Sequence, residues 1–313
     1  MRKIFLFSVL LSLVLSGCAV KGNTATEFLL NTVVNIKADA SSDTINGAFS
    51  LAREYEQLLS RTIDTSEVSR LNNGEIFAVS NDTLYLLKTA IAYSQKTNGA
   101  FDVSIGGVSS LWDFNEQTVP DKSDIAAALK KVDYKKIQIN GNVVDTGGAT
   151  VDLGAVAKGF IADKVRDYLA DNGVLNATIN FGGNVVVMGD EYSVVGIKSP
   201  FGDGVSAKIL VKNTSVVTSG TYERTFTKNG KQYHHILDTK TGYPLDTDLV
   251  SATIICEDGT KADILSTCCL CLGLSDAKEL IEKEDGAEAI FITRDGEIFV
   301  SSGIYCENGF YRL

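Results

Sequence analysis

The feature that most constrains this fold is a succession of short strand-like runs in the second half of the chain. The runs are rich in β-branched residues, as is typical of β-strands, and they cover residues 178–181, 185–188, 193–197, 208–211, 215–219 and 250–255. Many neighbouring runs can pair directly. The pattern therefore favours an α+β fold, with mixed sheets and packed helices, over a doubly wound parallel sheet.

The rest of the chain mixes helical and extended patterns. Apolar residues at helical spacing predict helices, over residues 44–59, 84–93, 124–131, 157–169, 261–272 and 275–282. Extended patterns predict strands over residues 28–38, 136–144 and 150–153, and a closing hairpin of residues 288–293 and 297–300. Residues 101–112 are apolar but contain Gly106-Gly107, which indicates irregular backbone near a ligand. Without a repeat or a disordered linker, residues 27–313 are predicted to form one catalytic unit.

The N-terminus has the pattern of a secretory signal that ends in a lipobox. Arg2 and Lys3 precede an apolar run, and Leu15-Ser16-Gly17-Cys18 follows it. The run is shorter than the roughly 20 residues that a spanning helix needs, and small residues before a cysteine suit cleavage and acylation. We predict a signal peptide (1–17), a lipid on Cys18, a polar tether (18–26) and a domain held at the membrane outside the cytoplasm. An uncleaved anchor is the alternative.

Charge and cysteine content narrow the class of partner. Without Arg2 and Lys3 the formal net charge changes from −10 to −12, and no basic cluster stands out. Nucleic acid is therefore not an expected partner. Three cysteines lie in an apolar stretch with no second ligand group at metal spacing, namely Cys268, Cys269 and Cys271. They are predicted to be buried, inert thiols, with a soft-metal site as the alternative.

Residues 151–159, with the sequence VDLGAVAKG, are predicted to run from a strand through a tight turn into a helix. Free backbone N–H groups at a helix start attract anions, glycine lets a ligand approach the backbone, and Lys158 adds a mobile positive charge. A phosphate-bearing ligand fits this pattern, although ordinary architecture can produce the same junction.

The segment Asn180-Phe181-Gly182-Gly183-Asn184 links two apolar runs. Paired glycines allow an unusual turn or the close passage of a flat ligand, and Asn184 offers both a donor and an acceptor. Asn184 is therefore a candidate for binding a ligand. A bulged hairpin is the alternative.

The only histidines of the chain, His234 and His235, are adjacent. Adjacent residues on a strand point to opposite faces, so the two cannot hold one metal ion as a simple pair. One of them is a candidate for proton transfer near neutral pH, and a structural role is the alternative.

Asp263 and Thr267 lie four residues apart at the start of a predicted helix, and therefore on one face. Two hard oxygen ligands suit Mg²⁺, which also binds substrate phosphates. The alternative is that Asp263 caps the helix.

Taken in order, these pieces resemble the ApbE family, the FAD:protein FMN transferases. The resemblance covers nearly the whole chain after the tether, and its specificity lies in the joint order of five motifs: Asp-Leu-Gly-x-x-x-Lys-Gly, Gly-Gly-Asn, Ser-Gly-x-Tyr, His-Ile-Leu-Asp-x-x-Thr-Gly and Asp-x-x-x-Thr. It implies an α+β fold related to the T-fold.

The resemblance also implies the residues of the site. Those expected to line the FAD site are Leu30, Ala100, Phe101, Asp102, Asp152, Lys158 and Leu237. Those expected to hold Mg²⁺ are the backbone oxygen of Ala155 with Asp263, Ser266 and Thr267. His235 matches the histidine of the family and is the candidate general base, with Asp263 or water as alternatives. Thr239 replaces the usual proline after Asp238, which predicts a looser turn.

The activity implied is transfer of FMN from FAD to a threonine or serine hydroxyl of an acceptor protein. A phosphoester forms, AMP leaves, and Mg²⁺ is required. The usual acceptors of the family are subunits of membrane redox complexes, such as sodium-translocating NADH:quinone reductase, and extracytoplasmic electron-transfer proteins. The alternatives are a Mg²⁺-dependent FAD pyrophosphatase that releases FMN and AMP, and a lipoprotein that only binds flavin.

Overall fold

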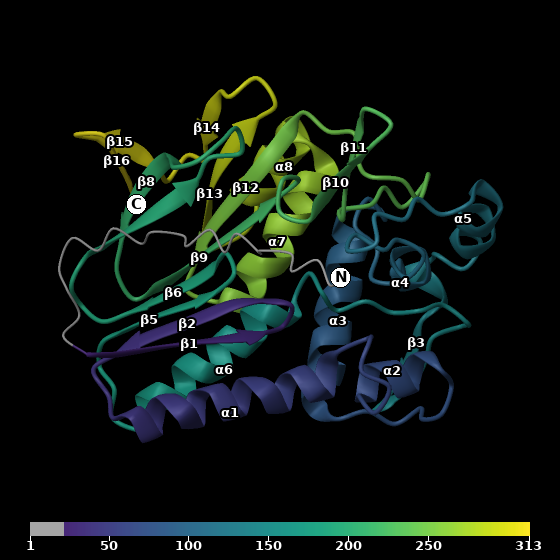
Figure 1. The fold of residues 1–313 in the computed structure, drawn as a ribbon, viewed down its shortest axis with the longest axis horizontal. Coiled ribbons are helices and arrows are strands. Elements are labelled where there is room, and N and C mark those ends of the chain that lie inside the picture. Colours follow the sequence, from purple (N-terminus) through teal and green to yellow (C-terminus); the bar gives the residue numbers. More distant parts are fainter. Residues whose placement is uncertain (1–21) are drawn as a thin grey trace, which may run out of the picture.

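An antiparallel sheet of eight strands forms the centre of the molecule (Figure 1) in a computed structural model that describes residues 22–313. The strand order is β1-β2-β5-β6-β9-β12-β13-β14. The strands are β1 Asn23–Leu29, β2 Thr32–Ala38, β5 Ala177–Phe181, β6 Asn184–Met188, β9 Thr214–Gly220, β12 Leu249–Cys256, β13 Ala287–Thr293 and β14 Ile298–Val300. The predicted α+β class is confirmed. The predicted signal peptide and Cys18 lie outside the described residues.

Helices cover one face of this sheet. They are α1 Ser42–Leu59, α3 Asn81–Lys96, α6 Ala157–Asp171, α7 Gly259–Leu272 and α8 Leu274–Glu282. Successive residues of a strand point to opposite faces, so Val186, Val217 and Ile254 belong to the core on the helical side. The predicted helices are confirmed, with ends that differ by a few residues. None of the helices in residues 22–313 combines the length and the hydropathy needed to cross a membrane.

A second sheet covers the opposite face. Its strand order is β15-β16-β8-β7, with β7 Ser193–Lys198, β8 Val205–Val211, β15 Tyr305–Glu307 and β16 Phe310–Arg312. Val185, Val216 and Ile255 of the central sheet pack against Ile197 and Ile209 of this second sheet. The alternation of apolar residues in the central strands therefore builds two cores, and the molecule has three layers.

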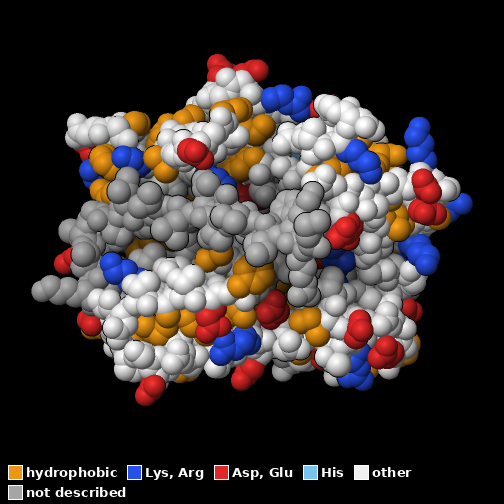
Figure 2. Space-filling view, in the orientation of Figure 1, with side chains coloured by type: hydrophobic (Ala, Val, Ile, Leu, Met, Phe, Trp, Pro, Cys, Tyr) orange, Lys and Arg blue, Asp and Glu red, His pale blue; other side chains and the backbone are white. Residues whose placement is uncertain are grey.

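A small lobe adjoins these layers at the right of Figure 1. Its elements are α2 Glu67–Asn72, α4 Gly106–Ser109, α5 Lys122–Leu129, the 3-10 helix η1 Tyr134–Lys136, and the hairpins β3 Gln138–Asn140 with β4 Val143–Asp145 and β10 Thr225–Lys228 with β11 Lys231–His234. Part of the lobe has its own apolar cluster around Trp112, Phe226 and Leu237. On the face shown in Figure 2, basic and acidic side chains of the described residues are interspersed rather than separated by sign.

The prediction of one strand over residues 28–38 is wrong. The chain turns at Leu30 and Asn31, whose φ angles are 54° and 55°, and β1 and β2 pair as a hairpin. Such turns favour glycine or asparagine, so leucine in the first position gave no turn signal. The predicted end of the tether at Thr26 is also wrong, because β1 begins at Asn23.

Two further strand predictions are corrected. Residues 136–144 contain a tight hairpin, β3 and β4, instead of one strand. Residues 150–153 form no strand, and Thr150 makes only an isolated bridge to Ile105. The hairpin β10–β11 was not predicted, because its exposed residues are mostly polar and carry little apolar alternation. The closing hairpin β13–β14 is confirmed. The prediction of irregular backbone at Gly106-Gly107 is wrong, because these residues begin the short helix α4.

Candidate active site

A residue of α7 accepts a hydrogen bond from a free backbone N–H group in the first turn of α6. Helix α6 has no side-chain cap of its own, and the backbone N–H of Gly159 donates to Asp263 Oδ2 at 2.8 Å. A Cβ on Gly159 would lie 2.1 Å from Gly259 O and 2.7 Å from Asp263 Cβ, so only glycine allows the two helices to approach this closely. Asp263 thus places a carboxylate at the positive end of α6.

Asp263 does not cap its own helix, so that alternative is wrong. The residue that caps α7 is Asp258, whose side chain accepts from Lys261 N at 2.8 Å. Asp263 lies one turn further along and is only 2% exposed. Burial raises its pKa, while the charge of Lys158 and the N–H of Gly159 lower it.

Asn184 lies beside this carboxylate, close enough to lower its pKa. The Asn184 side chain is 1% exposed, and neither Oδ1 nor Nδ2 has a hydrogen-bond partner within residues 22–313. A buried amide without partners is costly. Its position at the turn between β5 and β6, where Gly182 and Gly183 have φ of 61° and 104°, confirms the hairpin, and its free groups indicate a polar ligand at the end of that turn.

Three hydroxyl groups adjoin Asp263. Ser219 on β9 lies 2.7 Å from Ser266 Oγ and 3.3 Å from Thr267 Oγ1, and Ser266 donates to the backbone oxygen of Asp263 at 2.7 Å. The structure therefore brings together Asp263, Ser266 and Thr267 as predicted. We call these residues, with Lys158, Gly159, Asn184 and Ser219, the α6–α7 junction.

The turn that leads into α6 is tied to the loop of residues 100–103. Asp152 N donates to Val103 O at 2.8 Å. Asp152 Oδ2 pairs with Arg61 Nε at 2.9 Å, and Oδ1 accepts from Gly154 N at 2.9 Å. These bonds hold the turn and the loop side by side. Ala155 lies in this turn, just before α6, and is half-buried.

Asp102 is 5% exposed and is used inside its own loop. Its Oδ1 accepts from the backbone N and the Oγ of Ser104, at 2.9 and 2.6 Å, and its Oδ2 accepts from Tyr134 N at 3.1 Å. Asp102 therefore fixes the shape of the loop that presents Ala100 and Phe101. Phe101 itself is buried against the main core.

The segment that follows His235 closes on the same loop. Thr239 Oγ1 donates to Gly99 O at 2.6 Å, and Leu237 packs in the apolar cluster of the small lobe. The hydroxyl that replaces proline therefore supplies a bond to Gly99, and the looser turn stays a prediction.

The two histidines have different surroundings, as predicted. His234 Nε2 lies 3.1 Å from Leu245 O, whereas the ring of His235 meets the Phe114 ring edge-on at 6.5 Å. Burial, with the charges of Arg224 and Lys158, lowers the pKa of His235 to about 3. Its Nδ1 has no hydrogen-bond partner within the described residues. His235 is therefore a neutral imidazole in the field of two cations.

These motifs occur in one order on one fold, and the sequence matches the ApbE family over residues 30–291. The chain belongs to the ApbE family. An FAD:protein FMN transferase of Klebsiella pneumoniae is 37% identical over 81% of this chain and 83% of its own length, and one of Treponema pallidum is 34% identical over 82% and 78%. Crystallised ApbE of Thermotoga maritima shares 32% identity with a TM-score of 0.81, covering 90% of this chain and 97% of its own. The flavin transferase ApbE of Vibrio cholerae, at 26% identity, has a TM-score of 0.78 over 90% and 98%.

The donor set of the α6–α7 junction in this ApbE family member fits Mg²⁺. It offers hard oxygen atoms and one carboxylate, and Mg²⁺ takes such ligands while it keeps waters and binds substrate phosphates. Within residues 22–313, no group of three or more His, Cys, Asp or Glu side chains could enclose a metal ion by itself.

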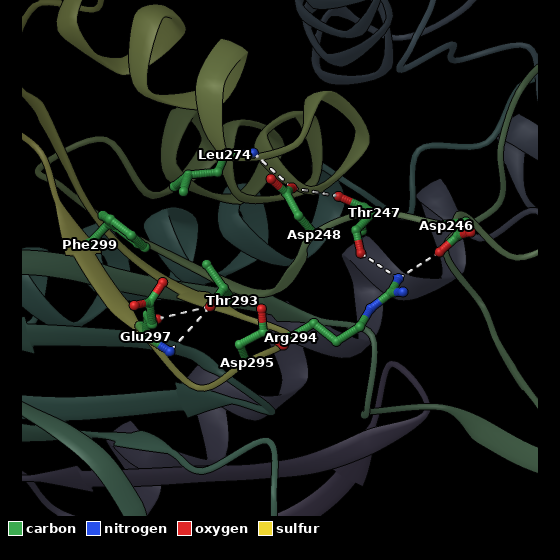
Figure 3. Close-up of a pocket in the computed structure, with 9 residues that line it drawn as sticks. All are labelled: Asp246, Thr247, Asp248, Leu274, Thr293, Arg294, Asp295, Glu297 and Phe299. Atoms are coloured by element: carbon green, nitrogen blue, oxygen red, sulfur yellow. Dashed lines mark hydrogen bonds and ion pairs between the residues drawn. The ribbon is translucent and has the colours of Figure 1, made fainter.

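The cavity in Figure 3 lies at the other end of α7 and contains none of the predicted residues. It has a volume of about 520 Å³ and is lined by Asp246, Asp248, Arg294 and neighbours. Arg294 pairs with Asp246 at 2.6 Å, and Asp248 accepts from Leu274 N at 3.0 Å. A rise of 1.5 Å per residue puts Leu272 roughly 14 Å from Asp263 along α7. A second cavity, of about 510 Å³, lies around Asp163 and Arg166. We assign the site to the α6–α7 junction, where the buried amide of Asn184 lies beside the Asp263 carboxylate.

The cysteines of α7 are structural in this ApbE protein. Cys268 and Cys269 are buried, Cys271 is half-buried, and all three are free thiols. Burial raises the pKa of each, that of Cys271 to about 12. The prediction of buried thiols is confirmed for Cys268 and Cys269, and their inertness stays a prediction. The soft-metal alternative finds no ligand cluster within the described residues.

Three residues at the site were not predicted. Arg61 pairs with Asp152, Arg224 lies beside His235, and Ser219 joins Ser266 and Thr267. Ser219 belongs to the Ser-Gly-x-Tyr motif, so the sequence marked its position but did not predict what its side chain does. Arg61 carried no signal beyond its charge, because its partner Asp152 is distant in sequence. Arg224 carried none because it meets His235 at the end of the β10–β11 hairpin, which was not predicted.

Proposed function

We propose that this chain transfers FMN from FAD to a threonine or serine hydroxyl of an acceptor protein, with Mg²⁺ bound at the α6–α7 junction. The observation that carries the proposal is the pairing of Gly159 with Asp263 beside the buried amide of Asn184. This arrangement combines a helix N-terminus, a lysine and a carboxylate at one place. Such a combination suits a pyrophosphate that shares a cation with the protein.

In the proposed reaction, the acceptor hydroxyl oxygen forms a bond to the phosphorus on the FMN side of FAD. The bond from that phosphorus to the bridging oxygen breaks, and AMP leaves with the bond electrons. Lys158 and the N-terminus of α6 offset negative charge on the phosphate oxygens. The site would hold Mg²⁺ through Asp263, Thr267, Ser266 and the Ala155 carbonyl, and the ion would supply charge neutralisation and orientation of the leaving group.

His235 takes the proton of the acceptor hydroxyl in this proposal. Its imidazole is neutral in the protein alone, with an unpartnered Nδ1 that can accept a proton. Burial is the main cause of its low pKa, and the positive charges of Arg224 and Lys158 lower that pKa further. A bound phosphate anion offsets those charges and so raises the pKa. Base strength thus increases when the substrate is in place.

The experiment is incubation with FAD and Mg²⁺, with and without a soluble acceptor fragment, followed by denaturation. Flavin that stays on the acceptor supports transfer. Free FMN and AMP in the absence of acceptor indicate a pyrophosphatase, and intact FAD in both arms indicates a protein that only binds flavin. Asp263→Asn keeps the shape of the side chain and removes its charge, so it should abolish Mg²⁺-dependent turnover. Full activity of that variant with a chelator present would remove the metal from the mechanism.

We also propose that a lipid on Cys18 holds the domain outside the cytoplasm, near acceptors in membrane redox complexes or extracytoplasmic electron-transfer proteins. The support is the Leu15-Ser16-Gly17-Cys18 sequence and the start of β1 at Asn23. Five residues span at most roughly 18 Å, so the anchor would keep the domain close to the bilayer. Cys18→Ser should abolish acylation, measured by intact mass, yet leave transfer to a soluble acceptor unchanged. Loss of that transfer in a folded variant would show that the anchor shapes the site.

A further inference from the structure

Ser219 connects the two hydroxyl side chains of the α6–α7 junction. Its Oγ lies 2.7 Å from Ser266 Oγ and 3.3 Å from Thr267 Oγ1. The strand sets this position: Ser219 pairs with Ala252 across β9 and β12, and Ala252 belongs to the core on the helical side. The Ser219 side chain therefore points at α7.

The direction of each hydrogen bond in this chain of hydroxyls follows from its last member. Ser266 donates to the backbone oxygen of Asp263 at 2.7 Å, and a carbonyl can only accept. A hydroxyl has one hydrogen, so Ser266 must accept from Ser219. Ser219 has then used its own hydrogen and must accept from Thr267. The order is Thr267 to Ser219 to Ser266 to Asp263 O, with each hydroxyl donating once.

This order of hydrogen bonds fixes where the hydrogen and the lone pairs of the Thr267 hydroxyl point. Because the Thr267 hydrogen points to Ser219, the lone pairs of Thr267 Oγ1 remain for another partner. A cation needs lone pairs and is repelled by a hydroxyl hydrogen. The orientation of Thr267 is thus decided by a residue of β9 that does not touch the cation itself.

We infer that Ser219 is a positioning residue of the Mg²⁺ site, which orients Thr267 and Ser266 through this relay of hydrogen bonds. The inference rests on the proposed Mg²⁺ site at Asp263 and Thr267. The relay also gives a role to the Ser-Gly-x-Tyr motif. A Cβ on Gly220 would lie 2.4 Å from the Tyr222 ring, so Gly220 lets that ring close on the end of β9, directly beside Ser219.

The chain offers a matched control on the same strand. Thr218 is adjacent to Ser219, and its hydroxyl lies 2.8 Å from that of Thr253 on β12. Successive strand residues point to opposite faces, so this hydroxyl pair lies away from α7. Thr218→Val removes one hydroxyl of β9 without touching the relay.

The test titrates Mg²⁺ calorimetrically into the full domain with saturating FAD and no acceptor, and records the thermal midpoint without metal. Ser219→Ala should raise the apparent Kd for Mg²⁺ by about 10- to 100-fold, the usual effect of losing a group that orients a metal ligand. Ser219→Thr, which keeps the hydroxyl, and Thr218→Val should bind Mg²⁺ like the wild type. The metal-free midpoint of Ser219→Ala should match that of Thr218→Val.

The outcomes separate this inference from the function on which it rests. Thr267→Ala should lose Mg²⁺ binding, and if it binds Mg²⁺ normally the metal site itself is wrong. If Thr267→Ala loses Mg²⁺ and Ser219→Ala keeps wild-type affinity, the relay is wrong and the metal site stands. Should Ser219→Ala fail to fold, Ser219→Cys keeps the size of the side chain with a much weaker donor. Wild-type Mg²⁺ affinity in that variant would likewise contradict the relay.

Discussion

Leu30 donates its backbone N–H to Glu56 Oε1 at 2.8 Å, and this bond joins the β1–β2 turn to α1. Leu30 has a φ of 54°, in the left-handed region that disfavours a branched apolar side chain. Glu56 thus helps to hold a strained residue at a position that the family resemblance assigns to FAD binding. Strain of this kind is typical of functional sites.

Leu30→Asn should relieve that strain at the expense of FAD binding. Asparagine tolerates a positive φ, so the free energy of unfolding should be unchanged or rise by up to about 1 kcal/mol, while the Kd for FAD rises. Chemical denaturation and fluorescence titration of FAD measure the two effects. Lower stability together with unchanged FAD affinity would mean that Leu30 serves the fold alone.

Gly159→Ala should separate α6 from α7. A Cβ there would meet Gly259 O at 2.1 Å, and overpacking of this kind typically costs about 1–3 kcal/mol. The bond from Gly159 N to Asp263 should lengthen, so FMN transfer should fall with stability. Gly107→Ala is the control for stability, because its nearest contact would be an ordinary 3.6 Å. Equal denaturation midpoints for the two variants would contradict the close packing of α6 and α7.

His235→Ala should lower the rate of FMN transfer by about 10²- to 10⁴-fold, the usual loss for a general base. His234→Ala should have a much smaller effect, because the His234 ring is already bonded to Leu245 O. Single-turnover transfer to a soluble acceptor measures both. A larger loss at His234 would reverse the assignment.

His235 should also make stability depend on pH. Its pKa is about 3 in the folded chain against an ordinary 6.5, so the unfolded chain binds the extra proton between these values. Stability is then fully present above pH 6.5 and is lost as the pH falls toward 3. Urea denaturation at pH 7 and pH 5 should show a smaller loss on acidification for His235→Gln than for the wild type. Equal losses would show that His235 is solvated in the folded chain.

Among the thiols of residues 22–313, only that of Cys306 should react rapidly with a thiol reagent while the domain is folded. It is exposed on β15, whereas Cys256, Cys268 and Cys269 are buried and Cys271 is half-buried. Burial raises the pKa of these four thiols, which leaves little reactive thiolate near neutral pH. A disulfide reagent such as DTNB should therefore modify one thiol quickly and the others only in denaturant. Fast modification of two or more thiols would show that α7 opens readily.

Local sequence determined the helices and strands that form because of the spacing of their own apolar residues. Apolar periodicity placed α1, α3, α6, α7 and α8, and β-branched alternation placed most strands of the central sheet, because burial of one face needs only the right period. Local sequence also revealed the motif around Asp152 and Lys158 and the pair Asp263 and Thr267, because each motif lies within a few residues. The order of such motifs predicted the family. The α+β class followed from the same runs.

Tertiary structure decided what depends on residues far apart in the sequence. Local sequence made Asp263 look like a cap for its own helix, yet Asp258 takes that role and Asp263 completes α6 instead. The turn at Leu30 adopts its backbone against the preference of leucine, with a hydrogen bond to Glu56. Packing of β9, α6 and the small lobe against one another created the contacts of Ser219, Arg61 and Arg224. A hydrogen bond between segments depends on packed geometry, and no local pattern of residues encodes that geometry.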